Sequence, residues 1–256
     1  MRIARFSVAD RIVFGVVEGE DGDAHVTAID GHPFGPFELT GARFPLADVR
    51  LLAPVVPSKV VAVGKNYAAH VKEMGGEAPE NPVLFLKPST SVVGPDDPIR
   101  LPPLSDEVHH EAELAVVVGR LVREVPIERA LEAVLGYTCA NDVTARDLQR
   151  ADGQWTRAKG FDTFCPLGPW VVTDLDPGDL LVRCTVDDVV RQEARTSALL
   201  HPVAELVSYA SAVMTLLPGD VLLTGTPAGV GPIVDGDVVE VTVEGIGTLR
   251  NPVEEA

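Results

Sequence analysis

Apolar residues along this chain fall in short runs separated by turn-forming residues, a pattern that predicts strands more often than helices. Three such runs occupy the first part of the chain, and Gly31-His32-Pro33 follows the last of them. We therefore expect a small β-rich N-terminal unit over residues 1–57, with Pro54 and Pro57 bracketing the linker. The three runs are Ile3–Val8, Ile12–Glu18 and Ala24–Ile29.

The remainder, residues 58–256, mixes strand patterns with a few helix patterns. Prolines recur through residues 77–103, which predicts extended strands and covering loops and excludes a long helix there. We expect a mainly β (α+β) domain with few helices, whose sheet is coiled and closes toward a barrel. The expected strands are Lys59–Val63, 111–118, Leu180–Val186, Val221–Thr224 and Val238–Val243. The expected helices are Asn66–Met74, Ile127–Val134 and Val203–Leu217.

Two carboxylates, Glu111 and Glu113, stand two positions apart where the apolar run 111–118 begins. Strand side chains alternate, so both would point to one face. Two like charges on a buried face repel and lose hydration, and a divalent cation is the simplest compensation. The alternative is a solvated strand face, which the β-branched residues that follow make less favourable.

Asp142, after an apolar strand-like piece, is the third candidate ligand, although Asn141-Asp142 is also compatible with a plain turn. Three carboxylates form an all-oxygen site that suits Mg²⁺, with Mn²⁺ as an alternative and Ca²⁺ as a weaker fit. Zn²⁺ fits less well, because His109 and His110 are neighbours and would face opposite ways on a strand.

His70 and Glu73 lie three positions apart on a predicted helix and would share a face. A carboxylate bound to one imidazole nitrogen fixes the tautomer and raises the basicity of the other nitrogen, as activation of a water molecule requires. The alternative is an ordinary His–Glu pair on the surface with no role in catalysis.

Arg146 and Lys159 are candidate partners for a substrate carboxylate or a developing enolate, although most such residues are only surface charges. The glycine-rich loop after Val221–Thr224 offers backbone N–H groups that suit a carboxylate, or it is an ordinary turn. It lacks the GxxxxGK[ST] pattern of a phosphate-binding loop.

The formal net charge of −17 over 256 residues argues against nucleic acids or anionic membranes as partners, because both bind clustered cations. A small anionic substrate would need local cations or a metal to enter this field. The three cysteines form no CxxC pair and are expected to be buried thiols. No signal peptide or membrane helix is predicted, so we expect a soluble cytoplasmic protein.

Taken together, these motifs resemble the fumarylacetoacetate hydrolase family over about residues 59–253. The matching segments, in the family's order, are GKNYAAHVKEMG at 64–75, HHEAELAVVVG at 109–119, NDVTARDLQ at 141–149, KGFDTFCPLGPW at 159–170 and TGTPAGVG at 224–231. The resemblance implies a coiled, barrel-like mixed β-sheet domain and a homodimer. It also implies that a divalent metal assists the cleavage or decarboxylation of 2,4-diketo acids and related 2-oxo acids.

Roles are carried over by motif. Glu111, Glu113 and Asp142 would hold the metal, His70 and Glu73 would activate water on a segment that orders as a lid, and Lys159 would stabilise the enolate. The residues expected around the substrate are Asn66, Tyr67, Arg146, Gln149, Gly225 and Thr226. No aspartate occurs between Ala53 and Ala69, where longer members carry an extra ligand, so the chain resembles the short branch.

The predicted function is hydrolysis of an acylpyruvate C–C bond, decarboxylation of oxaloacetate, or both, through a metal-bound pyruvate enolate. The alternative within the same scaffold is a 2-hydroxyhepta-2,4-diene-1,7-dioate isomerase or a 5-oxopent-3-ene-1,2,5-tricarboxylate decarboxylase of aromatic catabolism. A third hypothesis, a non-catalytic acidic module that binds Ca²⁺ or a protein, leaves His70, Glu73 and Lys159 unexplained.

Overall fold

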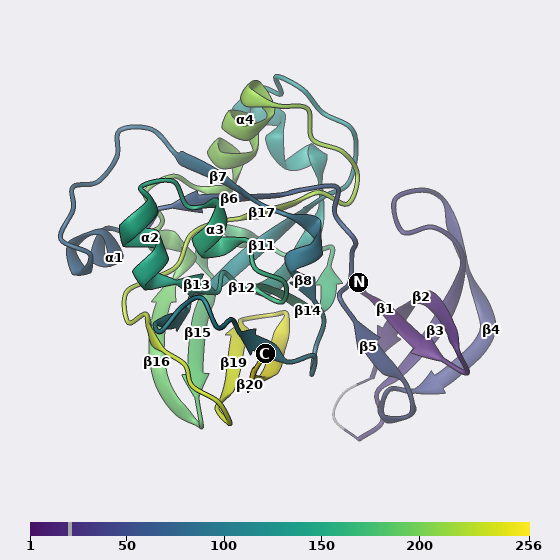
Figure 1. Cartoon of the computed structure of the whole chain (residues 1–256). Coiled ribbons are helices and arrows are strands. Elements are labelled where there is room, and N and C mark those ends of the chain that lie inside the picture. The colour runs from purple at the N-terminus through teal and green to yellow at the C-terminus, as the bar shows by residue number, and fades with distance from the viewer. Residues whose placement is uncertain (20–21) are drawn as a thin grey trace.

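The computed structural model describes residues 1–19 and 22–256, and strands dominate it (Figure 1). Its strands form three sheets. The largest contains β1 (Arg2–Val8), β2 (Arg11–Glu18), β3 (His25–Gly31), β4 (Phe37–Pro45), β5 (Arg50–Leu52), β6 (Val60–Gly64), β7 (Val83–Lys87), β8 (Val92–Val93), β11 (Ala112–Val118), β12 (Val134–Asn141), β14 (Cys165–Val172) and β17 (Val221–Leu223). The two smaller sheets contain β10 (Val108–His110), β13 (Thr144–Ala145) and β18 (Gly231–Pro232), and β9 (Ile99–Leu101), β15 (Leu181–Val186), β16 (Val189–Arg195), β19 (Val238–Val243) and β20 (Gly247–Glu255).

The helices are few and short. The α-helices are α1 (Ala68–Glu73), α2 (Arg146–Asp152), α3 (Thr156–Lys159) and α4 (Val203–Val213). The 3₁₀ segments are η1 (Leu46–Asp48), η2 (Ser89–Ser91), η3 (Ile127–Ala133), η4 (Pro177–Asp179) and η5 (Thr196–Ala198). Within the described residues, none of these helices has the length and apolar character needed to cross a bilayer.

The mainly β fold with few helices is confirmed, but the sheets are mixed and open. The path through the large sheet runs β4-β3-β2-β1-β14-β12-β11-β17-β6-β7 and ends on two edge strands. The expected closure toward a barrel therefore does not occur within the described residues.

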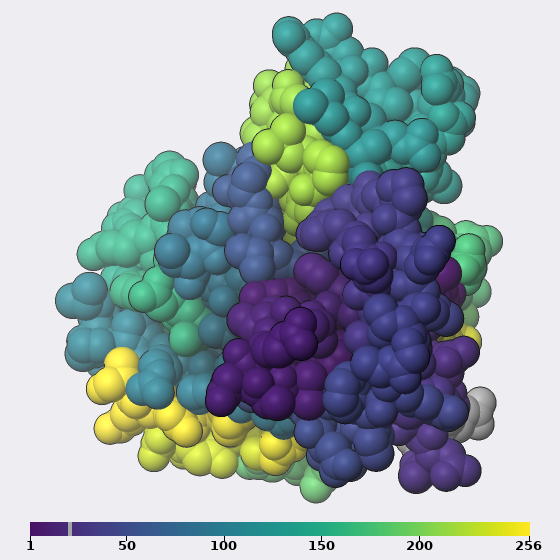
Figure 2. Space-filling model, turned by 90° about the vertical axis from the view of Figure 1, so that its right-hand side faces the viewer, coloured from purple at the N-terminus to yellow at the C-terminus, as the bar shows by residue number. Residues whose placement is uncertain are grey.

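The N-terminal strands form an antiparallel meander that joins the rest of the molecule through β1 (Figure 1). Figure 2 shows the N-terminal residues, in purple, packed against the remainder of the molecule. Arg2 pairs with Val172 and Ile3 with Val171, so the sheet continues from β1 into β14. A separate small apolar cluster around Phe6 and Val26 lies within this meander. The N-terminal part thus has its own core and yet extends the larger sheet.

β11 lies at the centre of the large sheet, between β12 and β17, and is buried on both faces. Leu114, Val116 and Val118 belong to one apolar cluster, whereas Ala115 and Val117 belong to another. This alternation follows from the two-residue repeat of strand side chains. It fixes the direction in which the carboxylates at the start of the strand point.

All three predicted helices differ in extent from those in the structure. The helix predicted over Asn66–Met74 covers Ala68–Glu73, and the other two differ more in form or length. Residues Ile127–Ala133 form a 3₁₀ helix rather than an α-helix, and Val134 already pairs with Val118 as the first residue of β12. The helix predicted over Val203–Leu217 ends at Val213, because Leu216 exchanges backbone hydrogen bonds of 2.9 and 3.0 Å with Val122. In both cases pairing with a residue that lies elsewhere in the chain ends the helix early.

Candidate active site

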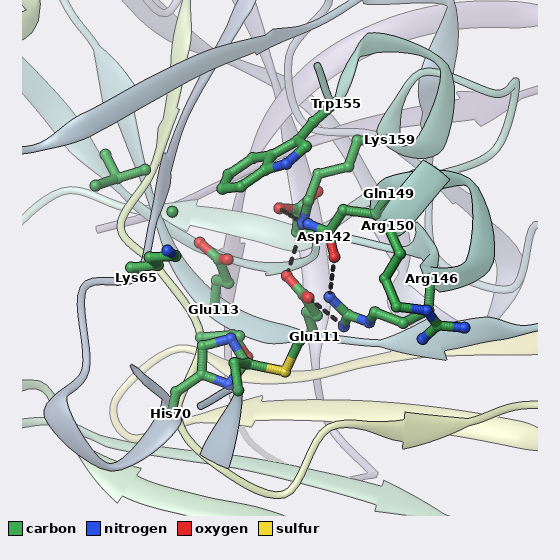
Figure 3. A pocket seen from close by; sticks show the side chains of 14 residues that line it. Lys65, His70, Glu111, Glu113, Asp142, Arg146, Gln149, Arg150, Trp155 and Lys159 are labelled. Atoms are coloured by element: carbon green, nitrogen blue, oxygen red, sulfur yellow. Dashed lines mark hydrogen bonds and ion pairs between the residues drawn. The ribbon is translucent and has the colours of Figure 1, made fainter. Parts of the chain in front are cut away.

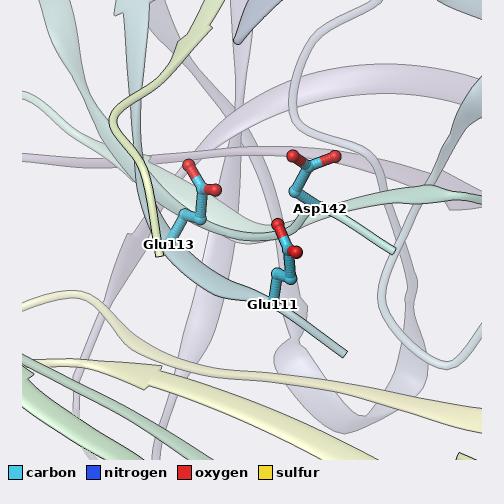
Figure 4. A group of neighbouring side chains, drawn as sticks. All are labelled: Glu111, Glu113 and Asp142. Carbon is cyan, nitrogen blue, oxygen red and sulfur yellow. The ribbon is translucent and has the colours of Figure 1, made fainter. Parts of the chain in front are cut away.

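The three predicted metal ligands meet where β11 and β12 come together (Figure 4). Glu113 lies in β11, Glu111 lies in the break between β10 and β11, and Asp142 follows β12. A hydrogen bond of 2.8 Å from the Asp142 backbone N–H to the Glu111 carbonyl oxygen holds the two strand ends together. One carboxylate oxygen from each residue lies within 4.8 Å of the others.

All three carboxylates are almost inaccessible to solvent, with residue exposures of 4%, 1% and 1% for Glu111, Glu113 and Asp142. Buried carboxylates need compensating partners. The Lys159 ammonium donates to Glu111 Oε2 at 2.8 Å and to Asp142 Oδ2 at 2.7 Å (Figure 3). Arg146 donates to the other oxygen of Glu111, and Lys87 donates to the other oxygen of Asp142.

Glu113 has a different environment from its two neighbours. Among the described residues its hydrogen-bond partner is the Gly225 backbone N–H, at 2.6 Å, and no cationic side chain forms an ion pair with it. Burial raises the pKa of Glu113 well above its usual value, and the charges of Asp142 and Glu111 raise it further.

The pKa values of Glu111 and Lys159 both shift in the direction that favours the charged form of the group. Burial raises the pKa of Glu111, but the positive charges of Lys159 and Arg146 outweigh it and leave that pKa below its usual range. Burial lowers the pKa of the Lys159 ammonium, but Asp142 and Glu111 outweigh it, so the net pKa is raised. Lys159 is therefore protonated and positively charged at neutral pH.

This donor set fits a hard divalent cation. The three carboxylates supply oxygen atoms only, and no histidine or cysteine of the described residues joins them. Glu113, which forms no ion pair with a cationic side chain among the described residues, is the group whose ionised form such an ion would stabilise. Carboxylate and water oxygens at about 2.0–2.1 Å are the shell that Mg²⁺ prefers.

His70 and Glu73 lie on the same face of α1, as their spacing predicted. His70 Nδ1 lies 3.1 Å from Glu73 Oε2, which places Nε2 on the opposite side of the ring. The other carboxylate oxygen, Oε1, accepts a hydrogen bond of 2.9 Å from the Gly229 backbone N–H. Glu73 therefore both orients the imidazole and attaches α1 to the loop that follows β17.

A cavity joins the three carboxylates to His70, whereas Glu73 lies outside its lining (Figure 3). Its lining includes apolar, acidic and basic side chains from segments that are distant in the sequence. The lining residues are Val63, Gly64, Lys65, His70, Met74, Glu111, Glu113, Asp142, Arg146, Gln149, Arg150, Trp155, Lys159 and Thr226.

Three residues predicted around the substrate do not line this cavity. The Asn66 amide donates to the carbonyl oxygens of His201 and Thr224, at 3.0 and 2.7 Å. Tyr67 is 2% exposed, and Gly225 gives its N–H to Glu113. These three residues therefore support the segments that form the cavity wall and do not themselves face the cavity.

Gly225 illustrates why that position is a glycine. Its φ of +100° lies in the left-handed region, and a Cβ there would lie 2.7 Å from the Cβ of Asn66. Because the loop turns tightly here, its N–H reaches the carboxylate of Glu113.

Two polar residues that support the site were missed from the sequence. Lys87 has a fully buried side chain and donates to Asp142 and to the Val143 carbonyl oxygen. Gln192 accepts from the Ala112 N–H at 3.0 Å and donates to Thr226 Oγ1 at 2.7 Å. For Lys87, the sequence offered one indication, its position at the end of the apolar run Val83–Lys87. No feature of the sequence pointed to Gln192.

Comparison with known proteins agrees with this geometry. Residues 59–254 match the family described as Fumarylacetoacetate (FAA) hydrolase C-terminal, and residues 1–54 match the one described as Rv2993c-like, N-terminal. The chain belongs to the fumarylacetoacetate hydrolase family, so the resemblance read from its motifs is confirmed.

Individual relatives carry different activities in their names. A crystal structure of 5-carboxymethyl-2-hydroxymuconate delta-isomerase from Mycobacterium smegmatis is 61% identical, with a TM-score of 0.95 and 100% coverage of both chains. The oxaloacetate tautomerase fahd2, mitochondrial, of Xenopus laevis is 44% identical over 81% of this chain and 69% of its own length. Maleylpyruvate hydrolase from Sphingobium sp. SYK-6, solved with manganese(II) and pyruvate, is 34% identical, with a TM-score of 0.82 and 100% coverage of both chains.

Proposed function

We propose that this enzyme uses a divalent metal ion to hydrolyse the C–C bond of an acylpyruvate, to decarboxylate oxaloacetate, or both. The observation that carries the proposal is the buried trio Glu111, Glu113 and Asp142 in one cavity with His70, whose ring is held by Glu73. The manganese and pyruvate in the maleylpyruvate hydrolase structure support a metal and a 2-oxo acid in a related site.

A divalent ion held by the three carboxylates would act as a Lewis acid toward the oxygens of a 2-oxo acid. The protein's own cations add to this effect. Lys159 donates its three N–H groups to Glu111, Asp142 and Thr144, and its positive charge lies beside the position where negative charge would develop. The cavity also presents Arg146 and Gln149, which hydrogen-bond to each other at 2.7 Å and offer donors to a carboxylate.

The dyad separates the two reactions. For hydrolysis, His70 Nε2 accepts a proton from water while Nδ1 stays with Glu73, and the resulting hydroxide attacks the distal carbonyl carbon. The C–C bond then breaks, giving a carboxylic acid and the enolate of pyruvate. Decarboxylation of oxaloacetate forms the same enolate and CO₂ without an attacking water.

The second candidate is isomerisation or decarboxylation of an unsaturated dicarboxylic acid, such as a 2-hydroxyhepta-2,4-diene-1,7-dioate. The full-length similarity to a delta-isomerase at 61% identity favours it. The same dyad and lysine would then move a proton between carbon atoms of a dienol, and no bond of the carbon chain would be hydrolysed.

The test is a substrate screen with Mg²⁺ or Mn²⁺, and again after EDTA. Acetylpyruvate and oxaloacetate are followed by pyruvate release, and a dienol diacid by the ultraviolet shift of its chromophore. Metal-dependent pyruvate release supports the first candidate, whereas a chromophore shift without chain cleavage supports the second. Equal rates with metal and with EDTA would refute a metal-dependent mechanism.

Mg²⁺ as the ion used in the cell, homodimerisation and a cytoplasmic location stay predictions. So does the expected absence of nucleic-acid and membrane partners. The dimer is checked by light scattering, and the ion by metal analysis of protein purified without added metal.

A further inference from the structure

Lys65 enters the cavity wall from a constrained piece of backbone. It directly follows β6, and its φ of +61° lies in the left-handed region that few non-glycine residues adopt. Such conformations persist where the surrounding structure holds them, and they occur often at ligand sites. Its side chain is half-buried and lines the cavity.

The neighbouring glycine shows what holds this segment. A Cβ on Gly64 would lie 2.5 Å from the Trp155 ring, so the backbone before Lys65 lies directly against the indole. Trp155 in turn makes an edge contact with Phe85, with ring centroids 5.3 Å apart. The backbone that leads into Lys65 is therefore packed against an aromatic wall of the cavity.

Lys65 differs from the other cations of the cavity in having no carboxylate partner. Lys159 and Arg146 bind the metal-site carboxylates, and Arg150 pairs with Glu107. In residues 1–19 and 22–256, no salt bridge involves Lys65. A positive charge that lines a cavity and lacks a partner is available to an anionic ligand.

Position separates Lys65 from the cations around the carboxylate trio. In the view of Figure 3, Lys65 lies on the Glu113 side of the carboxylate trio, and Arg146, Gln149 and Arg150 lie on the other side. A 2-oxo acid whose first carboxylate lies towards Arg146 would extend its other end past Glu113, on the side of His70 and Lys65. The dyad and the free ammonium thus flank the distal part of the substrate.

We propose that Lys65 binds a second carboxylate at the distal end of the substrate, so that the enzyme prefers dicarboxylic 2-oxo or 2,4-dioxo acids to monocarboxylic ones. This inference rests on the proposed function and adds the substrate class to it. The overall charge of −17 makes a dianion harder to attract, which is why a dedicated cation in the cavity is needed.

The test compares substrates of equal chain length that differ only at the distal end. 2,4-Dioxoheptanedioate and 2,4-dioxoheptanoate form one such pair. The wild-type enzyme should show the higher kcat/KM for the diacid. Lys65→Met should lower kcat/KM for the diacid about tenfold to hundredfold, as expected for a lost charged hydrogen bond, and change that for the monoacid by less than about threefold.

Lys72→Met, on the exposed part of α1, is the matched control and should leave both rates unchanged. Equal loss for diacid and monoacid in Lys65→Met, or no diacid preference in the wild type, would overturn the proposal. A melting temperature near that of the wild type excludes misfolding as the cause of a loss.

A binding experiment separates this inference from the proposed reaction. If neither substrate is turned over, the reaction is wrong, and the Lys65 proposal is then decided with 2-oxoadipate and 2-oxohexanoate by calorimetry on the Mn²⁺-loaded protein. Tighter binding of the diacid that disappears in Lys65→Met supports the distal site. Equal affinity for the two acids in the wild type rejects it.

Discussion

Glu113 is the residue at which the metal-free and metal-bound proteins should differ most. It is buried beside Glu111 and Asp142, and within the described chain no cation forms an ion pair with it. Its ionised form is therefore unfavourable until a divalent ion arrives. Ionisation of Glu113 in the metal-free protein is therefore opposed by its burial and by repulsion from Asp142 and Glu111.

Glu113→Gln should raise the melting temperature of the EDTA-treated protein, because it removes this repulsion. A group whose pKa is raised on folding stabilises below its unfolded pKa and destabilises as pH rises through its folded pKa. The gain should therefore be larger at pH 8 than at pH 5.5. Differential scanning fluorimetry at the two pH values checks this. A melting temperature of Glu113→Gln below that of the wild type at pH 8 would contradict the prediction.

The same substitution should abolish stabilisation by metal. At a concentration about 100 times Kd, a bound ion adds about 2.7 kcal/mol to the wild type, or roughly 5–10 °C in a chain of this size. Glu254→Gln, an exposed carboxylate on β20, is the control that should keep the full metal-dependent rise.

Lys87 does not line the cavity and supports the site by donating a hydrogen bond to Asp142. Lys87→Met should lower the free energy of unfolding by about 3 kcal/mol, because it removes one of the two cations that compensate the buried Asp142 carboxylate. The double variant Lys87→Met/Asp142→Asn should recover much of that loss and remain inactive. Urea titration and the pyruvate assay check both; a double variant no more stable than Lys87→Met would argue against the pairing.

At this scale the sequence was informative where a motif is local. Glu111 and Glu113 are two positions apart, and their shared face follows from strand geometry. Lys87 and Asp142 meet only after β7, β11 and β12 are assembled, and a single buried lysine in an apolar run carries no mark of its partner. The placement of Asn66 is similar, since its partners His201 and Thr224 lie far along the chain.

Among the elements, α1 is a six-residue helix that touches the site through its dyad and the loop after β17 through Glu73. Glu73→Gln can keep an oxygen that accepts from the Gly229 N–H, but its NH₂ group then faces His70 Nδ1 and removes the acceptor that orients the imidazole. Acetylpyruvate hydrolysis should fall about 10²-fold or more, whereas oxaloacetate decarboxylation should change little. Parallel kcat measurements check this; equal loss of both would mean that the dyad does not act through water.

β16 supports the loop after β17 through one buried side chain, Gln192. Gln192→Leu leaves the Ala112 N–H and the Pro227 carbonyl oxygen without their partners and should cost about 3 kcal/mol of stability. Glu193→Leu, on the exposed side of the same strand, should stay within about 0.5 kcal/mol of the wild type. Chemical denaturation measures both, and similar values for the two would refute the supporting role.

Element boundaries show where periodicity stops being sufficient. The pattern predicted Val238–Val243 as the structure has it, because alternation there matches one buried face. It extended α4 by four residues to Leu217, since the apolar Leu216 fits a helix as well as the bridge to Val122 that it forms. Only the assembled molecule decides between these two uses of one side chain.

On the scale of the whole molecule, the sequence predicted an N-terminal unit but not its continuity with the large sheet. The pairing of Ile3 with Val171 joins segments from opposite parts of the chain, and no local pattern encodes it. A chain shortened to residues 55–256 should expose the edge of β14 and lose solubility. Size-exclusion chromatography and thermal melting check this; an unchanged melting temperature would show that the N-terminal strands are dispensable.

Lys87, Arg146 and Lys159 hydrogen-bond to two of three buried carboxylates, so the side chains of the centre carry three positive and three negative charges once a bound ion has allowed Glu113 to ionise. A divalent ion therefore enters a nearly neutral environment and leaves it with surplus positive charge. An anionic substrate removes that surplus. Ion and substrate should consequently bind cooperatively, each increasing the affinity of the other by the same factor, as thermodynamic reciprocity demands.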